Sequence, residues 1–128
     1  MKKILQRFQL NGSDKIPAAA NATTPGVYAL SNRLRDEYAR VTGVFVVNES
    51  ATDLAKVYFH LNIGGVEILP KEITLSLLEY NGNFSLKDTA YDFAADKIPA
   101  RSSDFEMEFS NTQTANVELS VYFILEND

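Results

Sequence analysis

The stretch AKVYFHLNI, Ala55–Ile63, decides the fold class, because apolar and polar side chains alternate in it without a break. In an extended strand successive side chains point to opposite faces, so one face of this segment is apolar and the other carries Lys, Tyr, His and Asn. Val117–Leu125 alternates in the same way, and so does the stretch from Phe105 to Phe109. One face packed on the core and one face exposed to solvent are typical of antiparallel sheets. The three segments predict an all-β protein.

Weaker strand signals occupy much of the remaining chain, and the total is about eight or nine strands. Turn signals such as Gly64-Gly65 separate them, and the four prolines fall between the expected strands. This pattern favours an eight-stranded antiparallel jelly-roll sandwich, with two sheets about 10 Å apart. The further strands are expected at Lys3–Leu10, Val27–Leu30, Tyr38–Val47, Val66–Leu69 and Ile73–Tyr80.

A single domain spanning residues 1–128 fits this length, and a chain of this size buries enough surface to fold without disulfides. The sequence contains no cysteine. Tyr38–Val47 is rich in apolar residues at every position, which indicates a strand covered on both faces. The expected core consists of Phe45, Val57, Phe59, Leu61, Leu75, Leu77, Phe105, Phe109, Leu119, Val121 and Phe123.

Three segments do not fit the strand pattern. Asn11–Pro25 is rich in Ala, Asn, Thr and Gly, and with the preceding strand it makes residues 1–26 a possible N-terminal strand and arm. Ser85–Lys97 combines helix-capping spacing with acidic residues four apart, so its structure is expected to be mixed. Arg33–Glu37 is a candidate for a single helical turn.

Charge is distributed unevenly along the chain, whose net charge is −5. Residues 1–40 hold seven basic and three acidic side chains (+4), whereas residues 41–128 hold five and fourteen (−9). The acidic total argues against nucleic acid as a partner, because phosphate binding needs clustered Lys and Arg. Lys2 and Lys3 have no apolar run behind them, so no secretory signal is expected, and no segment is long enough for a membrane span.

Catalytic chemistry finds little support in these residues, and we expect no enzyme, no cofactor and no metal-dependent activity. His60 is the one histidine and lies on the polar face of a strand. Glu106 and Glu108 share the solvent face of another strand, where two carboxylates are ordinary surface residues. Calcium stays a minor option in the Asp88–Asp104 region, with Asp88, Asp92, Asp96 and Asp104 as possible ligands.

Tyrosines supply the remaining candidates for a binding site. A flat ring on an exposed sheet can stack on a sugar, contact a second subunit or simply cover the sheet. A carbohydrate- or receptor-binding β-sandwich module is therefore the alternative function. The candidate residues for this role are Tyr58, Tyr80, Tyr91 and Tyr122.

Three runs carry a resemblance to a known group of proteins: Arg40–Ser50, the hairpin-like Leu61–Pro70 and Val117–Leu125. Together they resemble the jelly-roll capsid proteins of tailless, membrane-containing icosahedral bacteriophages. The length is similar to that of the single-jelly-roll vertex (penton) proteins of this group. The resemblance covers residues 38–125 and rests on strand pattern and turns.

The resemblance implies a structural virion protein made in the host cytoplasm. Five copies would form a homopentameric ring at the five-fold vertex and would contact the neighbouring major capsid protein. Residues 1–26 would act as an arm toward the interior, where their basic side chains would meet the anionic lipid of an internal membrane.

Overall fold

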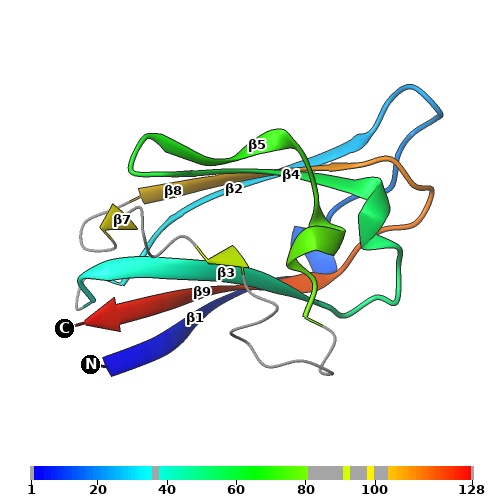
Figure 1. Cartoon of the computed structure of the whole chain (residues 1–128). Helices are drawn as coiled ribbons and strands as arrows, with labels where there is room; N and C mark the ends of the chain where they lie inside the picture. Colours follow the sequence, from blue (N-terminus) through cyan, green and yellow to red (C-terminus); the bar gives the residue numbers. More distant parts are fainter. Residues whose placement is uncertain (1, 36–37, 81–90, 93–97, 100–103, 128) are drawn as a thin grey trace.

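Two antiparallel sheets face each other in the computed structural model, which describes residues 2–35, 38–80, 91–92, 98–99 and 104–127 (Figure 1). The strand order is β1-β9-β3-β6 in the first sheet, where β7 also pairs with β3, and β2-β8-β4-β5 in the second. The prediction of an all-β, antiparallel, two-sheet protein is confirmed. The strand bounds are β1 Lys2–Leu10, β2 Gly26–Arg33, β3 Arg40–Asn48, β4 Val57–Ile63, β5 Val66–Thr74, β6 Tyr91–Asp92, β7 Ile98–Pro99, β8 Asp104–Asn111 and β9 Leu119–Asn127.

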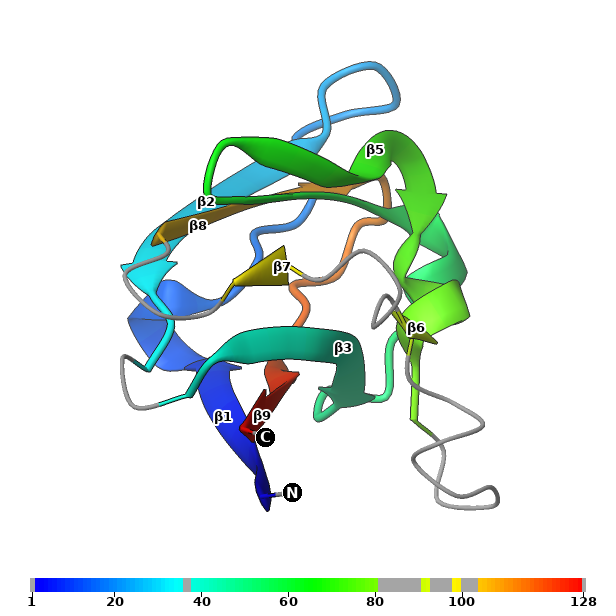
Figure 2. The same ribbon diagram turned by 60° about the vertical axis from the view of Figure 1, so that its left-hand side comes forward.

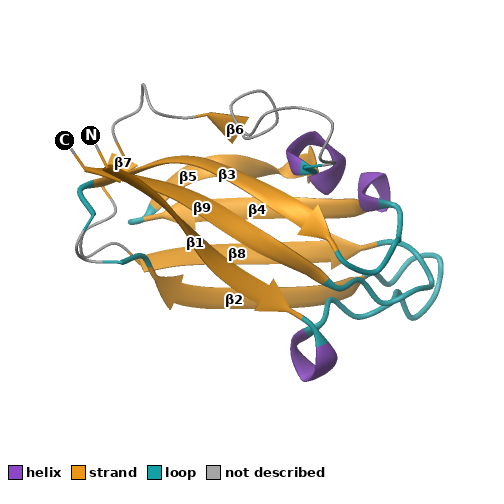
Figure 3. Cartoon of the chain, turned by 90° about the horizontal axis from the view of Figure 1, so that it is seen from below, coloured by secondary structure: helices purple, strands orange, loops and turns teal. Residues whose placement is uncertain are grey.

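The strand pairs are nested one inside another along the chain. The innermost pair is β4 with β5, followed outward by β3 with β6 and β7, then β2 with β8, and finally β1 with β9. Two further pairings, β3 with β9 and β4 with β8, join these hairpins side by side into the two sheets. The chain therefore crosses to the other sheet after each strand except β4, which is followed by β5, and β6, which is followed by β7. Figure 3 shows the two sheets from below.

The core lies between the sheets and is lined by the apolar faces that alternation predicted. Phe59, Phe109, Phe105 and Phe123 are buried there, with ring centroids 5.0 Å apart in the Phe59–Phe109 pair and in the Phe105–Phe123 pair. Phe45 is also buried, but it packs against Tyr80 and Tyr122 outside this main cluster. Burial is confirmed for Phe45, Val57, Phe59, Leu61, Leu75, Phe105, Phe109, Leu119, Val121 and Phe123.

The prediction of a strand over residues 73–80 and of a buried Leu77 was wrong. Strand β5 ends at Thr74, and Leu75–Leu78 forms a 3₁₀ turn, η3. Side chains three apart lie on one side of such a turn, so Leu75 and Leu78 both point into the core. Leu77 is thereby turned outward and is 57% exposed.

Other boundaries differ by a few residues. Strand β4 begins at Val57 because a 3₁₀ turn, η2 (Leu54–Lys56), precedes it, and the Asp53 side chain caps that turn by accepting from the Ala55 N–H. Strand β5 continues through Pro70, because the proline lies on an edge strand where the pairing with β4 is irregular, and proline is tolerated at such positions. The expected helical turn at 33–37 is not formed over 33–35, since β2 extends to Arg33 and an irregular segment follows.

Residues 11–25 lie against the sandwich. They contain a short 3₁₀ turn, η1 (Gly12–Asp14), and the buried Ile16, whose backbone N–H and C=O both bond to Val117. The buried Asn111 side chain donates to the Pro17 and Ala115 carbonyl oxygens. The segment emerges as the loop at the far end of the molecule from the two termini (Figures 1 and 2).

Candidate functional site on the outer face of the second sheet

Strand pairing brings four polar side chains together on the outer face of β4 and β8. Tyr58 lies opposite Ser110, and His60 lies opposite Glu108, in the antiparallel register of these strands. Because side chains alternate, the intervening Phe59 and Phe109 point into the core. The outward residues therefore belong to strands whose opposite side chains are fully buried in the core.

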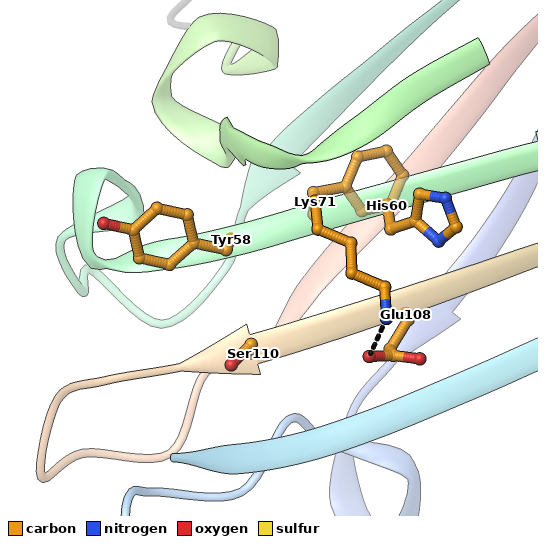
Figure 4. A pocket seen from close by; sticks show the side chains of 6 residues that line it. Tyr58, His60, Lys71, Glu108 and Ser110 are labelled. Atoms are coloured by element: carbon orange, nitrogen blue, oxygen red, sulfur yellow. Dashed lines mark ion pairs between the residues drawn. The ribbon is translucent and has the colours of Figure 1, made fainter. Parts of the chain in front are cut away.

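A fifth side chain reaches this face from the edge strand β5. Lys71 extends across β4 toward β8, and its Nζ lies 3.9 Å from Glu108 Oε1. Figure 4 shows Lys71 between the rings of Tyr58 and His60. Together these groups surround a shallow hollow of about 200 Å³. We call it the Tyr58 hollow, and it is lined by Tyr58, Phe59, His60, Lys71, Glu108 and Ser110.

His60 closes one end of the Tyr58 hollow and is fixed in place. Its Nε2 lies 3.2 Å from Glu67 Oε2 across the β4–β5 hairpin, and its side chain is 17% exposed. His60 lies on the outer face of a strand, as expected, but it is more covered than the half-exposed side chain that the sequence suggested. The contact of His60 with Glu67 joins β4 to β5 at the rim of the hollow.

The outer face of the first sheet is organised differently. Tyr122 stacks flat on Phe45, and the guanidinium of Arg7 lies 6.0 Å from the centre of the Tyr122 ring. Arg7 also donates to Ser120, whose hydroxyl bonds to Glu49. These contacts tie β1, β9 and the end of β3 together, so the side chains on this face are engaged with one another.

Of the four candidate tyrosines, the structure leaves Tyr58 open on the face of a sheet, where its side chain is 41% exposed. Tyr80 and Tyr122 both contact Phe45, which makes them part of the packing of the first sheet. Tyr91 belongs to strand β6, but its side chain lies outside the described part of the chain. Of the three candidate rings that the structure describes, Tyr58 is therefore the one open platform on a sheet face.

The two glutamates of β8 both face outward, as expected, but they have different surroundings. Glu108 is in the Tyr58 hollow beside Lys71. Glu106 lies two residues earlier on the same face of β8, where it is exposed and opposite Asn62. Both side chains come from one strand and flank no cleft, so the geometry does not favour the paired-carboxylate chemistry of glycosidases.

The possible calcium ligands fall mainly outside the described residues. Asp88 and Asp96 are not described, and for Asp92 only the backbone is. Asp104 is described, and its carboxylate accepts from Arg33 Nε at 3.1 Å. Within the described ranges no three His, Asp or Glu side chains form a group that could hold a metal ion.

Sequence reasoning missed Lys71. Pro70 suggested a loop at this point. Leu69 and Ile73 both face the core, so regular alternation would turn Lys71 inward, and the register shift of β5 between them lets Lys71 reach the outer face. Nothing in the sequence around a lysine that follows a proline indicates that it belongs to a binding site.

Among the described residues, no helix has the length and apolar character needed to cross a bilayer.

No protein-family model, curated protein or solved structure was found to match the chain.

Proposed function

We propose that the chain is a jelly-roll building block of an icosahedral virion shell, and that five copies form a ring at the vertex. The observation that carries the proposal is the nesting of the strand pairs. A jelly roll is an antiparallel hairpin ribbon wrapped into two sheets, so that its pairs enclose one another along the chain.

The count of eight strands follows if β6 and β7 are two parts of one strand. Tyr91 and Asp92 pair with Val44 and Gly43, and Ile98 and Pro99 continue along the same edge of β3. Both pairings are antiparallel and run in the same direction. On this interpretation each sheet has four strands, which is the jelly-roll arrangement.

A shell subunit needs lateral surfaces, and a ring needs two different ones. In a five-fold ring each copy contacts its neighbour through unlike patches, and rotation closes the contact. Large apolar side chains are exposed on several strands, including Leu5 on β1, Val27 on β2 and Val66 on β5. In the proposed assembly these positions meet the neighbouring copy or the neighbouring major capsid protein.

The charge asymmetry gives the proposed subunit an orientation. Residues 1–40 carry the basic excess, and Lys2, Lys3 and Arg7 belong to β1. Anionic lipid headgroups attract such residues by about 1 kcal/mol each near the surface. We therefore place the end of β1 that carries Lys2 and Lys3 toward the lipid of an internal membrane, whereas residues 11–25, which lie against the sandwich, are not an extended arm.

Light scattering from the purified chain, over a wide range of concentration, tests the ring. The expected result is a discrete species of five times the chain mass, with five-fold symmetric rings in negatively stained images. A dimer with two-fold symmetry at every concentration would contradict the proposal, because its contact joins like patches and cannot extend into a ring.

Vesicle flotation tests the orientation separately. The chain is expected to float with vesicles containing anionic phospholipid and to stay behind with neutral ones. Replacing Lys2 and Lys3 by Gln should reduce flotation, whereas replacing Lys56 and Lys71 by Gln is the matched control. Equal flotation of the two double variants would assign no role to the N-terminal charge.

A further inference from the structure

We propose that the Tyr58 hollow binds one neutral pyranose ring of a glycan. This function is independent of shell assembly, because it uses the outer face of the second sheet of a single copy.

Tyr58 provides the platform for the sugar. Tyr58 is 41% exposed, whereas Phe59 and Phe109, the phenylalanines between it and the other sheet, are fully buried. The axial C–H groups of a pyranose form an apolar face that packs on an aromatic ring, and the phenol at the ring edge stays in contact with water. Tyrosine also loses little conformational entropy on binding, because few bonds are immobilised.

Lys71 and Glu108 provide the polar contacts. The side chains are 67% and 45% exposed, so each still has free hydrogen-bonding capacity. A lysine ammonium only donates and an ionised glutamate only accepts, whereas each sugar hydroxyl can do both. A pair of adjacent hydroxyls can therefore accept from Lys71 and donate to Glu108 at the same time, in charge-assisted hydrogen bonds.

The size of the hollow limits the ligand. At about 200 Å³ it is smaller than the roughly 300–1,000 Å³ of sites for drug-sized ligands. The hollow is partly open to solvent, and Figure 4 shows the side chains of β4, β5 and β8 around it. One sugar ring fits such a site, and the rest of a glycan would extend over the sheet.

The surrounding charge favours a neutral sugar over an anionic one. Glu67 and Glu106 lie in the next row of the sheet, where both pair with Asn62. With Glu108 they give three carboxylates around one lysine. A sialic acid, a sulfated sugar or a phosphate would meet net negative charge at this face, which disfavours its binding.

The test is a titration of the isotope-labelled full chain, followed by amide chemical shifts. The probes are methyl β-glucoside, methyl β-galactoside and N-acetylglucosamine, with sialyllactose and inorganic phosphate as anionic probes. A single ring has about a dozen heavy atoms, so at about 0.3 kcal/mol per atom the expected dissociation constant is on the order of millimolar. The shifts should cluster on β4, β5 and β8 around Tyr58.

Matched variants separate the Tyr58 hollow from the rest of the face. Tyr58→Ala and Glu108→Gln are each expected to weaken binding by about tenfold, the equivalent of one lost contact. Glu106→Gln removes the same charge from the neighbouring outward position of β8 and should leave the affinity within about twofold. Tyr58→Phe keeps the platform and should retain binding, and the amide spectrum of each variant reports whether it is folded.

Three outcomes would overturn the proposal. One is the absence of shifts with all three neutral sugars at concentrations well above millimolar. Another is binding of sialyllactose or phosphate in preference to the neutral sugars. The third is an equal loss of affinity in Glu106→Gln and Glu108→Gln, which would indicate a general charge effect. Because the assay needs no ring, its result does not depend on whether the chain is a pentamer.

Discussion

The ring of Phe45 lies parallel to the ring of Tyr122, with their planes 5° apart and their centroids separated by 5.0 Å. The two residues face each other in the register of β3 and β9, on the side of the first sheet that points away from the core. This contact explains why Tyr122 is not available as a platform for a ligand. It joins β9 to β3, the strand that also pairs with β6 and β7.

A double-mutant cycle on Phe45 and Tyr122 should show that the rings stabilise each other. An aromatic pair contributes about 0.5–1.5 kcal/mol beyond the area it buries, so the two Ala substitutions should be less than additive by that amount. Urea unfolding of the parent, both single variants and the double variant measures the free energies. Additive losses would mean that the stacking contributes nothing of its own.

Leu75→Ala and Leu77→Ala should have very different effects, although the residues are two positions apart. Leu75 is fully buried and its truncation should cost about 2–5 kcal/mol. Leu77 is 57% exposed, so its truncation should change the free energy of unfolding by less than about 0.5 kcal/mol. If both variants lost the same stability in urea, residues 75–78 would have to be a strand and not the 3₁₀ turn η3.

Gly26→Ala should destabilise the protein by about 1–3 kcal/mol, the usual cost of overpacking. A methyl group at Gly26 would lie 2.0 Å from the Pro17 carbonyl oxygen and 2.6 Å from that of Ala18. Both atoms are backbone, and the chain cannot move away without losing the contacts of residues 16–19 with the sandwich. Thermal unfolding measures the loss, with the exposed Ser31→Ala on the same strand as the control. A variant as stable as this control would show that the loop is not held against β2.

Tyr28 should make stability fall in alkaline solution. Burial raises the pKa of Tyr28 above 10.0. The nearby Asp14 carboxylate raises it further, because its charge repels the phenolate and it accepts a hydrogen bond from the phenol hydroxyl. The folded state therefore keeps this proton more tightly than the unfolded state does. The stabilisation is complete below pH 10 and is lost as the pH rises through the folded-state pKa. Tyr28→Phe should flatten this decline in urea midpoints measured above pH 10, and equal slopes in parent and variant would contradict the assignment.

The strands with strict alternation could be predicted because one buried face forces a period of two. Phe105, Met107 and Phe109 alternate with outward polar residues in the sequence, and each one is buried in the structure. The segment after Thr74 could not be predicted in this way. Its spacing of apolar residues suits both an extended strand and a 3₁₀ turn, and the packing of Leu75 and Leu78 against the core decides between them.

The candidate site was predictable only in part. Tyr58, His60 and Glu108 could be assigned to outer faces, since their neighbours in sequence are core residues. That β4 and β8 lie side by side, which puts His60 opposite Glu108, depends on a pairing between residues about fifty positions apart. Lys71 joins them because the register of β5 against β4 shifts at residues 70–72.

Alternating hydrophobicity was enough to predict an antiparallel β structure, because it is a local property that any strand pairing must satisfy. Which strands are neighbours, and therefore which outward side chains meet, could be learned only from the folded chain. Strand order is set by contacts distant in the chain, and the alternation within a strand carries no information about its partner. The nested pairs, the stack of Phe45 on Tyr122 and the Tyr58 hollow all follow from that order.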